Sequence, residues 1–280
     1  MGEQKESAAL RFLYHTAPGR ALLRPLTAPA LSRAAGRWMD GRASRRLIGP
    51  FVRKNGIDLA EYLPEEYASF NAFFTRRIRP ERRPLDDAPD ALIAPCDGLL
   101  SAYRIAPDAA FAIKGSRYTA RDLLGGDAAA DAFSGGVCLV FRLCVNHYHR
   151  YCYFDSGEKG ENRFLPGRLH TVRPIALAAG PVFVQNSREY TLLHTEHFGL
   201  CAQIEVGALL VGRIENYHGA GRFARGEEKG RFLYGGSTVV LLLGPGAADI
   251  PQTLFDKTAR GGETPVRMGQ RIGSAAAVPV

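Results

Sequence analysis

From residue 91 onwards, the apolar residues of this chain occur in short runs that Gly, Pro and Asp residues separate. The longest runs, Val137–Phe141 and Val239–Leu243, are far shorter than the roughly 20 residues that a transmembrane helix needs. Many short strands with few helices favour a compact sandwich or barrel-like core. We expect strands at 91–95, 99–105, 137–145, 147–154, 181–185, 190–194, 200–206, 208–214 and 237–243. Residues 122–134 and 248–258 suit short helices or loops.

Residues 1–80 have a helical pattern instead, in which apolar residues from Leu10 onwards recur at helical spacing. Pro18-Gly19 is expected to break the first segment, and Ser69 is a suitable N-cap for a short helix. The sequence therefore predicts an α+β protein with two parts. These are a helical, basic, membrane-facing lobe at 1–85 and a β-rich catalytic domain at 86–280.

The positive charge of the chain is concentrated in its N-terminal third. Residues 1–83 carry 16 Lys and Arg against 8 Asp and Glu, whereas residues 84–280 carry 20 of each, so the net charge of +8 belongs to the first part. Such a lobe can face an anionic surface, and Arg42–Lys54 is a basic amphipathic segment of the kind that lies in a membrane interface. No recognisable nucleic-acid module accompanies the charge, so we expect no nucleic-acid partner. A solvated basic face is the alternative.

One short segment offers unusual chemistry: Gly235-Gly236-Ser237-Thr238 leads directly into the apolar run Val239–Leu243. Glycine tolerates backbone angles that other residues avoid, so the Gly236–Ser237 bond can be held in a strained geometry. The Ser237 hydroxyl could then attack the Gly236 carbonyl and convert the amide into an ester. Taken alone, Gly-Gly-Ser is more often an ordinary hairpin turn.

Several further segments, in their order along the chain, resemble the phosphatidylserine decarboxylase family over roughly residues 30–273. The match to the family's self-cleavage site is Gly-Gly-Ser-Thr-Val-Val-Leu-Leu, at 235–242. The other matching segments are Ser69–Arg77 with Arg83–Asp86, Pro95–Gly98, Tyr148–Arg150, Phe154–Gly157, Leu165–Leu169, Asn186–Glu189 and Val206–Gly212.

The resemblance implies a proenzyme that cuts itself between Gly236 and Ser237 into a β chain, 1–236, and an α chain, 237–280. Ser237 would become a pyruvoyl group, and no metal or external cofactor is expected. The pyruvoyl ketone would form a Schiff base with the amine of phosphatidylserine and accept the electron pair left when carbon dioxide departs. The product would be phosphatidylethanolamine.

The resemblance also implies catalytic roles for Asp97 and His149, which match the family's relay aspartate and its first motif histidine. The family's second histidine is replaced here by Cys152. The base for self-cleavage therefore stays open between His149, acting in both steps, and Cys152, acting as a thiolate if its pKa is depressed. His147 is a further candidate. His147 and His149 could share one face of a strand, but no Cys or carboxylate at suitable spacing completes a metal site.

For the substrate phosphate, the candidate ligands are Arg150, Arg188 and Lys114, because guanidinium and ammonium groups bind phosphate. The expected location is the cytoplasmic face of the cell membrane, where the protein would bind peripherally to an anionic membrane. The α and β chains would stay associated, and a homodimer is left open. Two alternatives remain: a pyruvoyl decarboxylase of a soluble amino acid, and an uncleaved lipid-binding homologue without catalysis.

Overall fold

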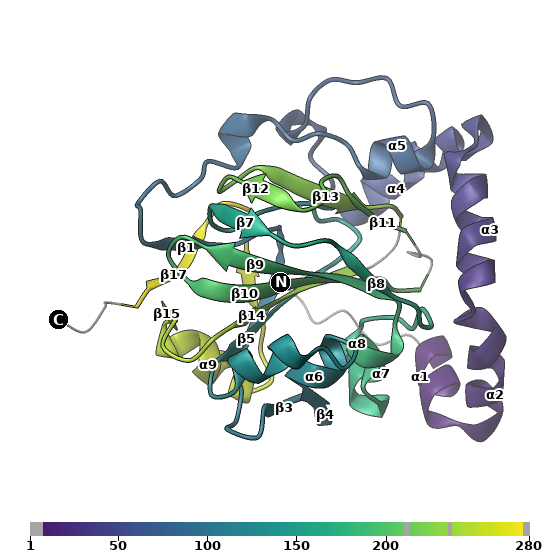
Figure 1. The fold of residues 1–280 in the computed structure, drawn as a ribbon. Helices are drawn as coiled ribbons and strands as arrows, with labels where there is room; N and C mark the ends of the chain where they lie inside the picture. Colours follow the sequence, from purple (N-terminus) through teal and green to yellow (C-terminus); the bar gives the residue numbers. More distant parts are fainter. Residues whose placement is uncertain (1–7, 210–212, 235–236, 277–280) are drawn as a thin grey trace.

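The N-terminal part of the protein is helical, as predicted. The computed structural model describes residues 8–209, 213–234 and 237–276. Helices α1, α2 and α3 follow one another along one side of the molecule, and α4 and α5 lie at the end of α3 (Figure 1). The elements of this part are α1 (Ala8–His15), α2 (Ala17–Leu26), α3 (Pro29–Asp40), the 3-10 helix η1 (Arg42–Leu47), α4 (Ile48–Asn55), η2 (Leu59–Glu61), α5 (Phe70–Phe74) and η3 (Pro80–Arg82).

Two of these α-helices begin at a side-chain cap. The Ser69 hydroxyl accepts a hydrogen bond from the Ala72 amide at 3.1 Å, as its predicted N-cap role requires. The predicted break at Pro18-Gly19 lies slightly earlier, at Thr16, whose hydroxyl caps α2 by accepting from the Gly19 amide at 3.0 Å. Proline fits the first turn because the amide that it lacks would have no acceptor within the helix.

A nine-stranded antiparallel sheet forms the centre of the protein. Its order is β12-β7-β9-β10-β14-β5-β2-β16, with β8 paired to β9. The sheet is open, with β12 and β16 at its edges, so the described strands form no closed barrel. The strands are β2 (Gly98–Arg104), β5 (Val137–Leu143), β7 (Gly157–Lys159), β8 (Arg163–Leu165), β9 (Arg188–Thr195), β10 (Gly199–Val206), β12 (Gly221–Phe223), β14 (Ser237–Leu243) and β16 (Thr264–Val266).

The smaller elements cover the central sheet. Helices α6, α7 and α8 lie on one side of it, and strands β11 and β13 lie on the other (Figure 1). The first small sheet contains β1 (Ala91–Ile93), β17 (Arg271–Ala275) and β15 (Ala248–Asp249), and the second β11 (Ile214–Asn216), β13 (Glu228–Phe232) and β6 (Arg150–Cys152). A hairpin pairs β3 (Ala110–Ile113) with β4 (Ser116–Thr119). The remaining helices are α6 (Ala120–Leu123), η4 (Ala128–Phe133), α7 (Pro174–Ala179), α8 (Val182–Gln185) and α9 (Gln252–Ala259).

The two faces of the central sheet enclose two separate cores, because successive residues of a strand point to opposite faces. Val240 and Leu242 of β14 pack in the core under α6 to α8, whereas Val239 and Leu241 pack in the core under the small sheets. A third, mainly aromatic cluster around Phe74 of α5 joins the helical part to the rest of the protein.

The structure corrects two expected strands, and a third lies partly outside the described residues. Residues 182–185 form helix α8 and bury Val182 and Phe183, because a short apolar run alone does not distinguish a strand from a helix. In 147–154 only Arg150–Cys152 is a strand, since a turn closes where the His147 amide donates to the Cys144 carbonyl. The expected strand at 208–214 overlaps residues 210–212, which lie outside the described ranges, and β11 begins only at Ile214.

None of the helices in the described part of the chain has the length and apolar character that crossing a bilayer requires.

Candidate functional site

Ser237 is the first residue of β14, where the sequence places it, and its side chain is completely buried. Its hydroxyl has no hydrogen-bond partner among the described residues. A buried hydroxyl normally has such a partner, so no described group competes with a reaction at this oxygen. Gly236, the other side of the predicted cleavage bond, lies outside the described residues.

Three neighbouring strands bring the predicted site residues to one end of the central sheet. Ser237 pairs with Leu143, the last residue of β5, and Leu99 of β2 pairs with Arg142. Asp97 directly precedes β2, and the two histidines follow β5. In an antiparallel sheet, one strand ends where its neighbours begin. Ser237, Asp97 and the segment with His147 and His149 therefore converge, although they lie far apart in the sequence.

Asp97 is held by an arginine. Its two carboxylate oxygens accept hydrogen bonds from Nε and Nη2 of Arg83 at 2.7 and 2.6 Å, and the Met268 amide donates to Oδ1 at 2.9 Å. Burial lowers the pKa of Arg83, but the hydrogen bond and the charge of Asp97 outweigh this and raise it. The sequence analysis assigned no role to Arg83, although its presence in a family segment was a signal. It fixes the orientation of the carboxylate.

His147 interacts electrostatically with Asp97 and has a defined tautomer. Its Nδ1 accepts a hydrogen bond from the Cys144 amide at 3.0 Å, so the proton of the neutral ring is on Nε2. Burial lowers the pKa of His147, and the Asp97 carboxylate opposes that shift only in part. His147 is therefore neutral at pH 7.

His149 has the opposite tautomer. Its Nδ1 donates to the His147 backbone carbonyl at 2.9 Å, so in the neutral ring the proton is on Nδ1. The side chain is completely buried, and its ring packs against Phe74 of α5 with the ring centres 4.1 Å apart. A neutral imidazole with its lone pair on Nε2 can accept a proton. In this protein a backbone carbonyl orients that imidazole, where a serine protease uses a carboxylate.

Cys152 lies close to the Asp97 segment, since its amide donates to the Pro95 carbonyl at 2.8 Å. Its thiol is buried, and burial raises the pKa of Cys152 to about 12. The condition for a thiolate base, a depressed pKa, is thus not met in this structure.

A buried ion pair, which the sequence analysis did not single out, lies on the same face of the sheet as Ser237. Nζ of Lys229 in β13 donates to Oε2 of Glu205 in β10 at 2.7 Å, and both side chains are completely buried. Glu205 pairs with Val239, two residues beyond Ser237, so Glu205 and Ser237 are diagonal neighbours. Burial raises the pKa of Glu205, and Lys229 counteracts this in part. In the sequence, the signal for a polar group on this face was the alternation of polar and apolar residues at 202–206.

The three candidate phosphate ligands bind other protein groups. Arg150 donates to Glu228 and to the Thr75 carbonyl. Arg188 donates to four backbone carbonyls. Lys114 donates to the Gly261 carbonyl on a different part of the surface. As for metals, no cluster of His, Cys, Asp and Glu within the described ranges has a suitable arrangement for an ion.

A buried serine at the start of a strand, with histidines and an anchored aspartate at the same end of the sheet, provides the residue types of a serine-nucleophile site. The family described as phosphatidylserine decarboxylase matches residues 70–274. The chain therefore belongs to the phosphatidylserine decarboxylase family.

Several curated proteins are similar to the chain over nearly its whole length. Phosphatidylserine decarboxylase proenzyme 2 of Clostridium acetobutylicum is 40% identical over 272 residues, which cover 97% of this chain and 93% of that protein. The phosphatidylserine decarboxylase proenzyme of Desulfitobacterium hafniense is 37% identical, with 94% and 91% covered. That of Ruminiclostridium cellulolyticum is 38% identical, with 95% and 90% covered.

Proposed function

We propose that this chain is a proenzyme that cleaves itself between Gly236 and Ser237 and then decarboxylates phosphatidylserine to phosphatidylethanolamine. The observation that carries the proposal is the buried Ser237 hydroxyl, which has no hydrogen-bond partner within the described residues. Membership of the family and the word proenzyme in its relatives' names support the same function.

Self-cleavage begins at the Ser237 hydroxyl. Nε2 of His149 takes the hydroxyl proton while Oγ attacks the Gly236 carbonyl carbon. The protonated His149 then gives this proton to the departing nitrogen as the C–N bond breaks, which frees the amine of Ser237 and leaves an ester between Gly236 and the Ser237 oxygen. Loss of the Ser237 α-proton expels the Gly236 carboxylate, and one water molecule replaces the nitrogen, which leaves as ammonia. The products are a chain ending at Gly236 and a pyruvoyl group at residue 237.

The residues around Ser237 suit such a group. The ketone supplies an electron sink for the electron pair that remains when carbon dioxide leaves. His149 can take up a proton and return it to the substrate α-carbon. Asp97 is anchored by Arg83, which keeps the negative charge of its carboxylate close to His147. The cores on both faces of the sheet exclude bulk water, which strengthens these electrostatic interactions.

The lipid substrate places the enzyme at a membrane surface, and residues 1–85 are the part that faces it. Apolar side chains are exposed on α1, α2 and α3: Phe12, Leu22, Leu26, Leu31 and Trp38. The same lobe carries the chain's net positive charge, and each Lys or Arg near an anionic leaflet contributes about 1 kcal/mol to binding. We therefore assign the protein to the cytoplasmic face of the cell membrane as a peripheral protein. The two chains stay associated because β14 lies between β10 and β5.

The test is the mass spectrum of the denatured protein. We expect two fragments that divide at Gly236/Ser237, the smaller one with a ketone terminus. Ser237→Ala should leave one 30.5 kDa chain without decarboxylase activity, because no hydroxyl remains to attack. Ser101→Ala, which alters another buried serine of the sheet, is the matched control and should be cut like the wild type. A wild-type chain that stays intact for days, or a Ser237→Ala chain that is cut, contradicts the proposal.

A further inference from the structure

A cavity of about 310 Å³ lies between helix α3 and the segment that leads to Ser237. Ser32, Gly36 and Asp40 of α3 form one side, and Leu233 and Tyr234 lie opposite. Tyr234 is three residues before Ser237 in the sequence, so their Cα atoms are at most about 11 Å apart. The cavity therefore adjoins the site. Its volume is at the lower end for small-molecule pockets, which suits a headgroup rather than a whole lipid.

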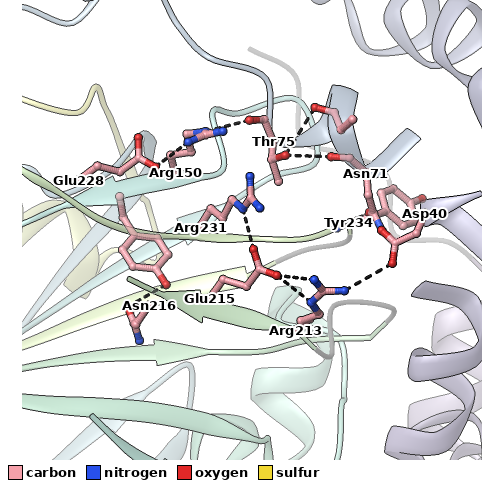
Figure 2. A network of polar contacts seen from close by, with 12 residues as sticks. Asp40, Asn71, Thr75, Arg150, Arg213, Glu215, Asn216, Glu228, Arg231 and Tyr234 are labelled. Atoms are coloured by element: carbon pink, nitrogen blue, oxygen red, sulfur yellow. Dashed lines mark hydrogen bonds and ion pairs between the residues drawn. The ribbon is translucent and has the colours of Figure 1, made fainter. Parts of the chain in front are cut away.

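The walls of this cavity are tied together by polar contacts (Figure 2). Oδ1 of Asn71 accepts from the Tyr234 amide at 3.1 Å, and its Nδ2 donates to Asp40 at 2.9 Å. Arg213 extends the network, since its guanidinium lies 3.4 Å from Asp40 and also donates to Glu215. Hydrogen bonds that span both sides hold the cavity open in a defined shape and connect α3 to the segment before Ser237.

The side chains that line the cavity carry an excess of positive charge, which favours the binding of an anion. Arg33 and Arg37 of α3 line it and lie one helical turn apart, on the same helix face. Both are exposed, and neither forms an ion pair with any described residue. The one carboxylate in the lining, Asp40, is already bound by Asn71 and Arg213. Two arginines at this spacing can bind a phosphate together.

A polar side chain inside the cavity is also without a partner. The Ser32 side chain lines the cavity, is 2% exposed, and its hydroxyl has no hydrogen-bond partner among the described residues. Buried hydroxyls are normally paired, so an unpaired one in a cavity wall indicates a ligand that supplies the acceptor. A phosphate oxygen is such an acceptor.

Apolar side chains flank these arginines on the same helix. Leu31 and Trp38 of α3 are 42% and 51% exposed, and an exposed apolar and basic helix surface is typical of helices that lie in a membrane interface. A lipid whose acyl chains stay among such residues would present its phosphate to Arg33 and Arg37 and its amine towards Ser237.

We infer that this cavity binds the phosphodiester of the lipid substrate, with Arg33, Arg37 and Ser32 as its ligands. The inference rests on the proposed function, and it replaces Arg150, Arg188 and Lys114 as the phosphate ligands. It assigns α3 a part in substrate recognition besides membrane contact.

The test compares Arg33→Ala/Arg37→Ala with the charge-matched pair Arg222→Ala/Arg260→Ala, whose exposed arginines lie outside the helical lobe and do not line this cavity. A short-chain phosphatidylserine, monomeric in solution, removes the contribution of membrane binding. We expect KM to rise about tenfold or more in the first pair, since charge-assisted hydrogen bonds to the phosphate are lost, with complete self-cleavage in the mass spectrum. The control pair should keep the wild-type KM. Ser32→Ala should raise KM by a smaller factor.

Two competitors identify the ligand. Glycerophosphoserine should inhibit the wild type and lose this effect in Arg33→Ala/Arg37→Ala, whereas inorganic phosphate should inhibit at most weakly. Equal KM values for the two double variants, or equal inhibition by the two competitors, would overturn the inference. A wild-type chain that is not cut at Gly236/Ser237 instead refutes the proposed function, so the two failures are distinguishable.

Discussion

The two faces of the central sheet have different contents, although the same strands build both. On the face under α6 to α8, β10 and β14 contribute mainly apolar residues, Ala202, Ile204, Val240 and Leu242, with Thr238 as a buried polar exception. On the face under β6, β13 and β11, the same two strands also contribute polar residues: Gln203, Glu205 and Ser237. Those residues lie towards one end of the strands, where β13 crosses the sheet with Lys229.

The difference shows where the fold is used for stability and where it is used for chemistry. Each apolar side chain that is buried in a core increases the free energy of unfolding of the protein. A buried ion pair gains little net stability, because desolvation cancels most of the attraction. Stability alone therefore does not account for the polar face, and Ser237, the proposed position of self-cleavage, shares that face with Gln203 and Glu205.

The largest effect is expected when one partner of the buried pair is removed. Lys229→Met should lower the free energy of unfolding by about 3–5 kcal/mol, because Glu205 is left buried without its cation. Urea unfolding of the uncut Ser237→Ala protein measures this. The double replacement Lys229→Met/Glu205→Leu should recover most of the loss, since an apolar pair of similar volume needs no desolvation.

An exposed ion pair is the matched control for that measurement. Arg117 and Asp108 pair at 2.9 Å with side chains 72% and 61% exposed, so Arg117→Ala should change stability by at most about 1 kcal/mol. If Lys229→Met is no more destabilising than Arg117→Ala, the two faces of the sheet do not differ in the way described here.

A smaller effect is expected on the apolar face. Val240→Ala removes part of a completely buried side chain and should cost about 2 kcal/mol in unfolding free energy. Self-cleavage, followed by mass spectrometry after rapid purification, should keep its wild-type rate, because Val240 points away from the Ser237 face. A rate that falls along with stability would show that the apolar core, too, controls the chemistry.

The smallest effect concerns pH. Burial lowers the pKa of His147 in the folded protein, so the unfolded chain takes up a proton first as the pH falls. The contribution of His147 to the free energy of unfolding is complete above the ordinary histidine pKa of about 6.5. This contribution is lost as the pH falls through the lower pKa that His147 has in the folded protein. His147→Gln should make the unfolding free energy less dependent on pH in that range. An unchanged profile would mean that His147 takes up its proton equally in both states.

Local sequence signals predicted the parts of the fold that depend on neighbouring residues. The Ser69 cap and the helical N-terminal part follow from caps and periodicity that a few residues carry. The start of β14 at Ser237 follows equally from glycines that precede an apolar run. The prediction failed at 182–185, where an apolar run of a few residues becomes helical because of what it packs against.

The sequence by itself determined the family, the α+β class, the candidate nucleophile and the two residues proposed to assist it. Only the tertiary structure decided that Arg83 holds Asp97 and that Lys229 and Glu205 meet inside the protein. The same is true of the cavity between α3 and Tyr234. The physical reason is that these contacts join residues far apart in the chain. Strand register and the packing of α3 bring them together, and no local pattern encodes either.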